Sequence, residues 1–259
     1  MSDKLLVEKD GDVAVIRLND PKTMNAITSD LATELKEAIE AAAGSSRAIL
    51  LASGERAFCS GANLSGGTVQ PGDPNADAGG ALEKHFNPLM MAIRDSAVPI
   101  VSAVRGAAAG VGSSISLAAD MIVAGKSAYF MLAFARIGLV PDGGATWLLT
   151  RAAGRARAME MMLLAEKIPA QQAMDWGLVN RVVEDDKIDE TAMELAQRLA
   201  KGPQPSLRLI RRQAWLAADG SFEEVLQAER EHQRDAGRSK DFAEGVSAFL
   251  EKRQAKFGG

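Results

Sequence analysis

Two glycine turns stand out in this sequence because each follows a strand-like apolar run. The segment 57–64, Ala-Phe-Cys-Ser-Gly-Ala-Asn-Leu, comes after Ala48–Leu51, and the segment 106–112, Gly-Ala-Ala-Ala-Gly-Val-Gly, comes after Ile100–Val104. Two such turns can direct two backbone N–H groups at one point, where a developing oxyanion would be stabilised. Because backbone donors need no charged side chain, the turns predict an oxyanion-stabilising site in a chain without a more familiar catalytic motif.

One acidic residue, Asp142, lies in the turn Pro141–Gly144 just ahead of a predicted helix. An aspartate in such a turn is most often structural, since its side chain can cap a helix or close a turn. The neighbouring Leu139, Val140 and Trp147 are apolar, however, and removing water from a carboxylate raises its pKa and makes it a stronger base. From the residues alone, Asp142 is either a cap or a candidate general base.

Other segments match functional motifs only in part. Gly110–Gly112 departs from the G-x-G-x-x-G order of a dinucleotide loop, and Gly125–Ser127 lacks the earlier glycine of a phosphate loop because position 120 is Asp. His85 and His232 are isolated, and no spacing of Cys, His and carboxylate residues indicates a metal site. We therefore expect neither a metal nor a nucleotide bound by these motifs.

Composition places the chain among ordinary globular proteins. Its 259 residues are 47% hydrophobic and 25% charged, enough for one large domain with a sizeable core. A net charge of −4 argues against a dedicated nucleic-acid binder, and no apolar run of about 20 residues indicates a membrane span. No signal peptide is recognised, and the single cysteine, Cys59, excludes internal disulfides and suits a reducing compartment. We expect a cytoplasmic protein.

Periodicity predicts an α/β chain with strands mainly early and helices late. Short apolar runs predict strands over residues 13–18, 48–52, 100–104, 121–124, 129–132 and 179–183. Helix-spaced apolar residues predict helices over 28–44, 82–94, 112–119, 147–149, 156–164, 170–176, 188–200, 206–216, 222–235 and 242–252. The stretch 65–80, rich in Gly, Pro, Asp and Asn, is predicted to be a mobile loop. These elements predict a core over residues 1–195 and a helical region over 196–259, whose apolar stripes indicate self-association.

Six segments in this order resemble the enoyl-CoA hydratase/isomerase (crotonase) superfamily, nearly end to end. They are Leu18–Lys22 with Asn25 and Ala26, Ala57–Leu64, Ala103–Gly106 with Gly110–Gly112, Ile137–Gly144, Gly154–Ala158 and Glu244–Arg253. The resemblance implies a spiral of ββα turns with a C-terminal helical trimerisation region. It also implies a trimer or a dimer of trimers, an acyl-CoA substrate, and no metal or redox cofactor.

The resemblance assigns the two oxyanion-hole N–H groups to Ala62 and Val111. Val111 would open the helix that follows it, so its N–H would be an unpaired first-turn donor at the positive end of the helix dipole. The family pattern further implies that the substrate and its CoA bind to residues in three segments and in the last helix. These are Lys22, Met24 and Ala26; Ser60, Gly61, Asn63 and Leu64; Gly110, Ser114 and Pro141; and Phe249 and Lys252. Phe249 and Lys252 are expected to reach the CoA of a neighbouring subunit, and their alternative is an ordinary helix face with a solvated charge.

The family's hydratases carry two glutamates that hold and activate water, and this chain departs from that pattern. The first glutamate aligns with Ser114 and the second near Phe134. The favoured interpretation of Ser114 is a small helix residue packed under the site. The resemblance therefore favours an isomerase in which Asp142 moves one proton. The pattern 133–144 is similar to the ring-1,2-epoxyphenylacetyl-CoA isomerase branch of phenylacetate breakdown, and general enoyl-CoA isomerases share much of it. Two alternatives remain: a hydratase or dehydratase using Asp142 with a bound water, and a non-catalytic acyl-CoA-binding protein. The acyl group is not specified; residues 65–80 and 82–94 are expected to shape its pocket.

Overall fold

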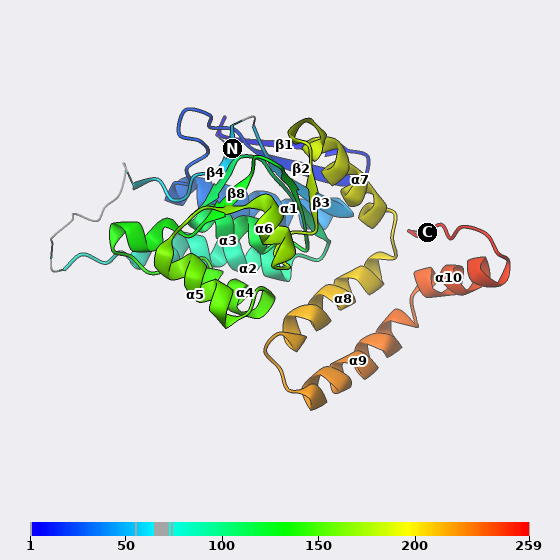
Figure 1. Cartoon of the computed structure of the whole chain (residues 1–259). Helices are drawn as coiled ribbons and strands as arrows, with labels where there is room; N and C mark the ends of the chain where they lie inside the picture. The colour runs from blue at the N-terminus through cyan, green and yellow to red at the C-terminus, as the bar shows by residue number, and fades with distance from the viewer. Residues whose placement is uncertain (1, 55, 65–72, 74, 259) are drawn as a thin grey trace.

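The structure is a computed structural model that describes residues 2–54, 56–64, 73 and 75–258. Its centre is a six-stranded sheet in the order β1-β2-β3-β5-β7-β10 (Figure 1). The strands are β1 (Leu5–Asp10), β2 (Val13–Leu18), β3 (Ala48–Ser53), β5 (Ile100–Val104), β7 (Met121–Gly125) and β10 (Arg181–Val183). All neighbours pair in parallel except β1 and β2. Every residue of β3 and β5 is buried, as expected for parallel strands covered on both faces.

A second, four-stranded sheet has the order β4-β6-β8-β9. Its strands are β4 (Ala57–Cys59), β6 (Ala107–Ala109), β8 (Tyr129–Met131) and β9 (Ile168–Pro169). Along the chain, β3, β5 and β7 of the large sheet are each followed directly by β4, β6 and β8 of the small sheet. This repeated step from one sheet to the other, with helices between repeats, confirms the predicted spiral of ββα turns.

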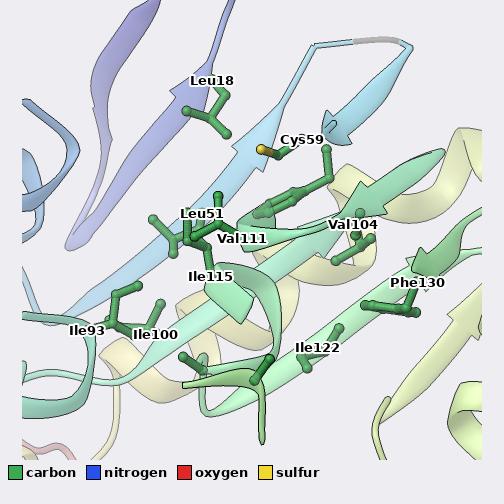
Figure 2. Close-up of a cluster of buried hydrophobic side chains, with 14 of the residues drawn as sticks. Leu18, Leu51, Cys59, Ile93, Ile100, Val104, Val111, Ile115, Ile122 and Phe130 are labelled. Atoms are coloured by element: carbon green, nitrogen blue, oxygen red, sulfur yellow. The ribbon is translucent and has the colours of Figure 1, made fainter. Parts of the chain in front are cut away.

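Helices cover both faces of the large sheet. On one face, α7 (Ile188–Ala200) buries Ile188, Ala192, Leu195 and Ala196 against the valines and alanines of β2, β3 and β5. On the other face lies the main core (Figure 2), in which Val111 and Ile115 of α3 (Val111–Leu117) pack with Leu51 and Ile100. The remaining elements on this side are α1 (Ser29–Ser45), the π-helix η2 (Leu82–Phe86), α2 (Asn87–Asp95), the 3-10 helix η3 (Ala133–Ile137), α4 (Ala145–Ala152), α5 (Arg155–Leu164) and α6 (Ala170–Asp175), whereas the 3-10 helix η4 (Asp185–Lys187) leads directly into α7.

Three C-terminal helices leave this core: α8 (Gln204–Ala217), α9 (Phe222–Ala236) and α10 (Lys240–Leu250). Figure 1 shows α8 and α9 side by side as a hairpin to one side of the sheets, with α10 beyond them. The division predicted at residue 195 falls within α7, which stays on the sheet to Ala200. Within the described ranges, no helix combines the length and the apolar character that a membrane crossing requires.

Most predicted elements agree with the structure, and two differences matter for the site. The predicted helix 82–94 begins with a π-helical turn, η2, before α2. The segments 57–59 and 107–109, predicted as parts of turns, are the short strands β4 and β6. Of the predicted loop 65–80, residues 65–72 and 74 lie outside the described residues.

Candidate active site

The two glycine turns meet in space, as the sequence predicts. Strands β4 and β6 are parallel neighbours, so the turns that follow them lie at the same edge of the small sheet. A Cβ placed on Gly110 would lie 3.6 Å from the Cα of Gly61, and a Cβ on Gly61 would lie 3.2 Å from the carbonyl oxygen of Ala109. Both glycines also have positive φ, +109° for Gly61 and +52° for Gly110. Glycine at these two positions therefore allows the two turns to touch.

Each turn presents one unpaired backbone donor. Around Ala62, the N–H of Ile27 donates to the carbonyl of Gly61 at 2.8 Å, and the N–H of Asn63 donates to the carbonyl of Ile27 at 2.8 Å. Val111 is the first residue of α3, where an N–H has no partner within the helix. No described residue accepts a hydrogen bond from the N–H of Ala62 or of Val111. Two free donors on touching turns are the arrangement that an oxyanion hole requires.

The loop between β2 and α1 is fixed against the first turn by Asn25, whose role the sequence did not reveal. Asn25 is buried, has a φ of +57°, and its Nδ2 donates to the carbonyl of Ala57 at 2.8 Å. The N–H of Ser60 donates to the carbonyl of Met24 at 3.0 Å, and the Oγ of Ser60 donates to Thr23 at 2.9 Å. This loop carries the predicted substrate contacts, of which Met24 is exposed and Ala26 half-buried, together with the exposed Lys22. The structure thus brings them beside Ser60 and Gly61.

Asp142 lies on the other side of Val111. The Oγ of Ser114 donates to the carbonyl oxygen of Asp142 at 3.0 Å. A Cβ on the next residue, Gly143, would lie 2.8 Å from the Cβ of Ser114 and 3.2 Å from Cγ2 of Val111. The loop Pro141–Gly144 therefore rests on the first turn of α3, the same turn that presents the Val111 N–H.

The Asp142 carboxylate has no structural partner. Its Oδ1 is buried and has no hydrogen-bond partner among the described residues, and burial raises the pKa of the carboxyl to about 6. The alternative of a helix cap is wrong, because the cap residue of α4 is Gly144 and no side chain caps that helix. A half-buried carboxylate with an unpaired oxygen and a raised pKa has the properties of a general base.

The predicted apolar surroundings of Asp142 are only partly correct. Val140 is 80% exposed, and Trp147 stacks on Trp215 of α8 with ring centroids 5.1 Å apart. A cavity of about 1080 Å³ lies between α2, α4, α8 and α9, and Gly143 and Gly144 form part of its wall. The Asp142 loop is therefore packed against α3 on one side and bordered by a cavity on another.

The two positions at which the family's hydratases carry glutamates are both buried here. Ser114 is fully buried in α3, and Phe134 in η3 is 7% exposed, with its Cζ atom 3.9 Å from where a Cβ on Gly110 would lie. Within the part of the chain that the structure describes, no group of three or more His, Cys, Asp or Glu residues could hold a metal ion.

The remaining residues that are predicted to contact the substrate lie at the edge of the candidate site or far from it. Asn63 follows Ala62 and is half-buried, Leu64 is 66% exposed, and Pro141 is half-buried beside Asp142. Phe249 is 82% exposed at the end of α10, and Lys252 follows it with a φ of +55°. Figure 1 places α10 far from α3 and α4, so these two residues do not join the site of their own chain.

Comparison with known proteins shows the family and the fold of this chain. Residues 8–259 match the model of the enoyl-CoA hydratase/isomerase family. The chain belongs to this family and has the crotonase fold. It is 39% identical to 1,2-epoxyphenylacetyl-CoA isomerase of Escherichia coli K12 over the full length of both chains. It is 41% identical to a probable enoyl-CoA hydratase of Rhodobacter capsulatus over 95% of each chain. The crystal structure of an enoyl-CoA hydratase from Polaromonas sp. JS666 superimposes with a TM-score of 0.90 at 29% identity, covering 98% of this chain and 99% of the other.

Proposed function

We propose that this protein is an acyl-CoA isomerase in which Asp142 moves a proton between two carbons of the substrate. The observation that carries the proposal is the buried, unpaired Oδ1 atom of the half-buried Asp142, on a loop that packs against the turn presenting the Val111 N–H. The thioester carbonyl oxygen accepts hydrogen bonds from Ala62 and Val111. Negative charge develops on that oxygen as a proton leaves carbon, and each donor contributes about 3–4 kcal/mol in the transition state.

The proton balance of this reaction needs one base and no second reactant. Asp142, ionised at neutral pH with a pKa of about 6, takes a proton from carbon and leaves a thioester enolate held by the two N–H groups. The same carboxyl then returns the proton to another carbon, or to the oxygen of an opened ring. Substrate and product have the same composition, so the reaction consumes neither water nor a redox cofactor. We accordingly propose that the enzyme uses no metal or cofactor, with coenzyme A serving as part of the substrate.

Isomerisation is favoured over hydration by the residues at positions 114 and 134. A hydratase of this family holds and splits water between two glutamates, whereas this chain has a buried hydroxyl and a buried phenyl ring there. The E. coli relative is named an isomerase of an epoxyphenylacetyl thioester, which supports that type of substrate or a simpler enoyl-CoA. The second candidate is hydration or dehydration with Asp142 and one bound water, because the R. capsulatus relative is named a hydratase.

The proposed function includes self-association through the C-terminal helices. Large apolar side chains are exposed on all three of them: Ile210, Leu216, Phe222, Leu226, Phe242, Val246, Phe249 and Leu250. Exposed apolar surface of this extent usually marks an interface. We propose a trimer or a dimer of trimers in which Phe249 and Lys252 reach the CoA of a neighbouring subunit. Light scattering at micromolar concentration should give the mass of three or six chains, and a stable monomer would contradict the assembly.

The proposed location and partners of the protein depend on its single cysteine and its net charge. Cys59 is a buried free thiol, which suits a reducing compartment, and the net charge of −4 does not favour nucleic acid. We propose a cytoplasmic enzyme whose partners are its acyl-CoA substrate and copies of itself.

The test is a turnover screen on a panel of CoA thioesters that includes crotonyl-CoA, longer enoyl-CoAs and an epoxyphenylacetyl thioester. Isomerisation leaves the product mass unchanged but alters its chromatographic and NMR signature, whereas hydration adds the mass of one water. Wild type should isomerise at least one thioester, and Asp142→Asn should bind it without turnover. Hydration of crotonyl-CoA well above any isomerisation would favour the second candidate. Calorimetric binding without turnover by the wild type would indicate a non-catalytic acyl-CoA-binding protein.

A further inference from the structure

The main-chain carbonyl of Asp142 joins two helices. It accepts a hydrogen bond from the Oγ of Ser114 in α3 at 3.0 Å and another from the N–H of Ala145, the first residue of α4, at 3.1 Å. The Ser114 side chain is completely buried, so its hydroxyl has no access to water as an alternative partner. A buried hydroxyl of this kind has a directed bond that is costly to lose.

The loop around Asp142 depends on α3 for its position. Gly143 and Gly144 both have positive φ, +57° and +76°, and both border the cavity between α2, α4, α8 and α9. On the side of α3, by contrast, Gly143 packs against Ser114 and Val111. The hydrogen bond from the Ser114 side chain therefore holds this loop against α3, on the side where the loop is packed.

We propose that Ser114 is the positioning residue of the general base. This inference depends on the proposed role of Asp142. Ser114 and Val111 lie three residues apart on the first turn of α3, so one rigid turn sets both the oxyanion donor and the main chain of the base. The hydroxyl fixes the distance between the group that removes the proton and the group that stabilises the resulting charge.

The first experiment compares Ser114→Ala with the matched control Ser116→Ala. Ser116 is also fully buried in α3, but its hydroxyl donates to the carbonyl of Ser113 at 2.9 Å and not to the Asp142 loop. We expect Ser114→Ala to lower kcat about tenfold or more, with unchanged affinity for a non-reacting acyl-CoA, and Ser116→Ala to keep the wild-type kcat. Equal kcat values for Ser114→Ala and wild type, or equal losses in the two variants, would overturn the proposal.

A second experiment needs no turnover and so separates this inference from the proposed function. Thermal stability is measured from pH 4 to pH 8 for pairs of proteins that differ only in Asp142→Asn, in the wild-type, Ser114→Ala and Ser116→Ala backgrounds. Within each pair, the pH at which the stability difference changes reports the titration of Asp142. We expect that midpoint to move to lower pH with Ser114→Ala, because the loosened loop exposes the carboxyl to water, and to stay unchanged with Ser116→Ala. An unchanged midpoint in the Ser114→Ala pair would overturn the positioning role, whatever the substrate screen shows.

Discussion

The Sγ atom of Cys59 accepts a hydrogen bond of 3.3 Å from the N–H of Gly61, inside the turn that presents Ala62. The same side chain packs against α3, since a Cβ on Gly112 would lie 2.7 Å from both the Cβ and the Sγ of Cys59. Burial raises the pKa of the thiol to about 12, so it is neutral and acts here through its shape and its hydrogen bond. Cys59 is thus a spacer between the turn of Ala62 and the helix turn of Val111.

This spacer role predicts different effects for two substitutions. Cys59→Ala leaves the buried N–H of Gly61 without an acceptor, which costs about 1–3 kcal/mol. Cys59→Ser restores an acceptor at nearly the same place. In urea unfolding, Cys59→Ala should therefore be clearly less stable than Cys59→Ser, and its kcat/KM should fall further. Equal stability of the two variants would show that the hydrogen bond contributes nothing.

Removing the N–H of Val111 tests the oxyanion hole. Val111→Pro deletes that donor, and proline is tolerated at the first position of a helix, so α3 should persist. Loss of one such donor should lower turnover about a hundredfold or more. The control Val111→Ala keeps the N–H and should retain turnover within a few-fold of wild type. A folded Val111→Pro protein with near-normal turnover would remove Val111 from the mechanism; Ala62→Pro provides the equivalent test on the other turn.

Asp142 predicts the pH dependence of catalysis. The base must be ionised, so kcat/KM should rise with pH through about 6 and then level off. Asp142→Asn keeps the shape of the side chain but cannot accept the proton, and should lower kcat by about 10²–10⁴-fold with little change in acyl-CoA affinity. Steady-state rates between pH 4.5 and 8.5 measure both effects. A pH profile that is flat across this range in wild type would exclude Asp142 as the titrating base.

The same raised pKa predicts that Asp142 destabilises the fold at neutral pH. The carboxyl titrates near 6 in the folded chain against an ordinary value of 3.8, so the folded state holds the proton more tightly than the unfolded state. Stability is therefore lost as pH rises from about 4 through 6. Asp142→Asn should have a higher Tm than wild type above pH 6, with the difference disappearing below pH 4. Calorimetry at pH 4 and pH 7 measures this difference in Tm. A lower Tm for Asp142→Asn than for wild type at pH 7 would contradict the prediction.

The sequence predicted those features of the candidate site that follow from the direction of the strands. It did not predict the features that depend on how distant segments pack together. The order of strand and turn predicted that the two glycine turns lie together, as they do, because parallel neighbouring strands end at one edge of a sheet; the assignment of the donors to Ala62 and Val111 came from the family resemblance and stays a prediction. The sequence did not reveal β4 and β6, which are only three residues long and, in β6, consist entirely of alanine. The roles of Ser114 and Asn25 arise from hydrogen bonds between segments about 30 residues apart, for which local periodicity carries no signal. The apolar neighbours of Asp142 in sequence, such as Val140, were misleading, because a turn directs successive side chains to different sides.

The side chain of Arg211 connects the C-terminal helix α8 to the core. Its Nε lies 2.7 Å from Oδ2 of Asp120, and its other nitrogens donate to the carbonyls of Ser96 and of Ile93, the latter at 2.9 Å. Arg211 is only 6% exposed, although it belongs to α8, and Asp120 also accepts the N–H of Ile100. This ion pair, of a buried arginine with an aspartate whose side chain is 22% exposed, thus connects α8 to the end of α2 and to the start of β5.

Replacing Arg211 removes the donor from the carbonyls of Ser96 and Ile93 and the cation from Asp120, whose side chain is 22% exposed. A polar group that loses its partner in this way typically costs about 1–3 kcal/mol. Arg211→Met should therefore lower the free energy of unfolding by that amount in urea titrations. The neighbouring, exposed Arg212 is the control, and Arg212→Met should change it by no more than about 0.5 kcal/mol. Burial already raises the pKa of Asp120 despite Arg211, so without the cation the carboxyl should titrate still higher. The Arg211→Met defect should consequently shrink as pH falls and Asp120 is protonated, and a defect that is equal at pH 5 and pH 8 would show that the ion pair is not what holds α8.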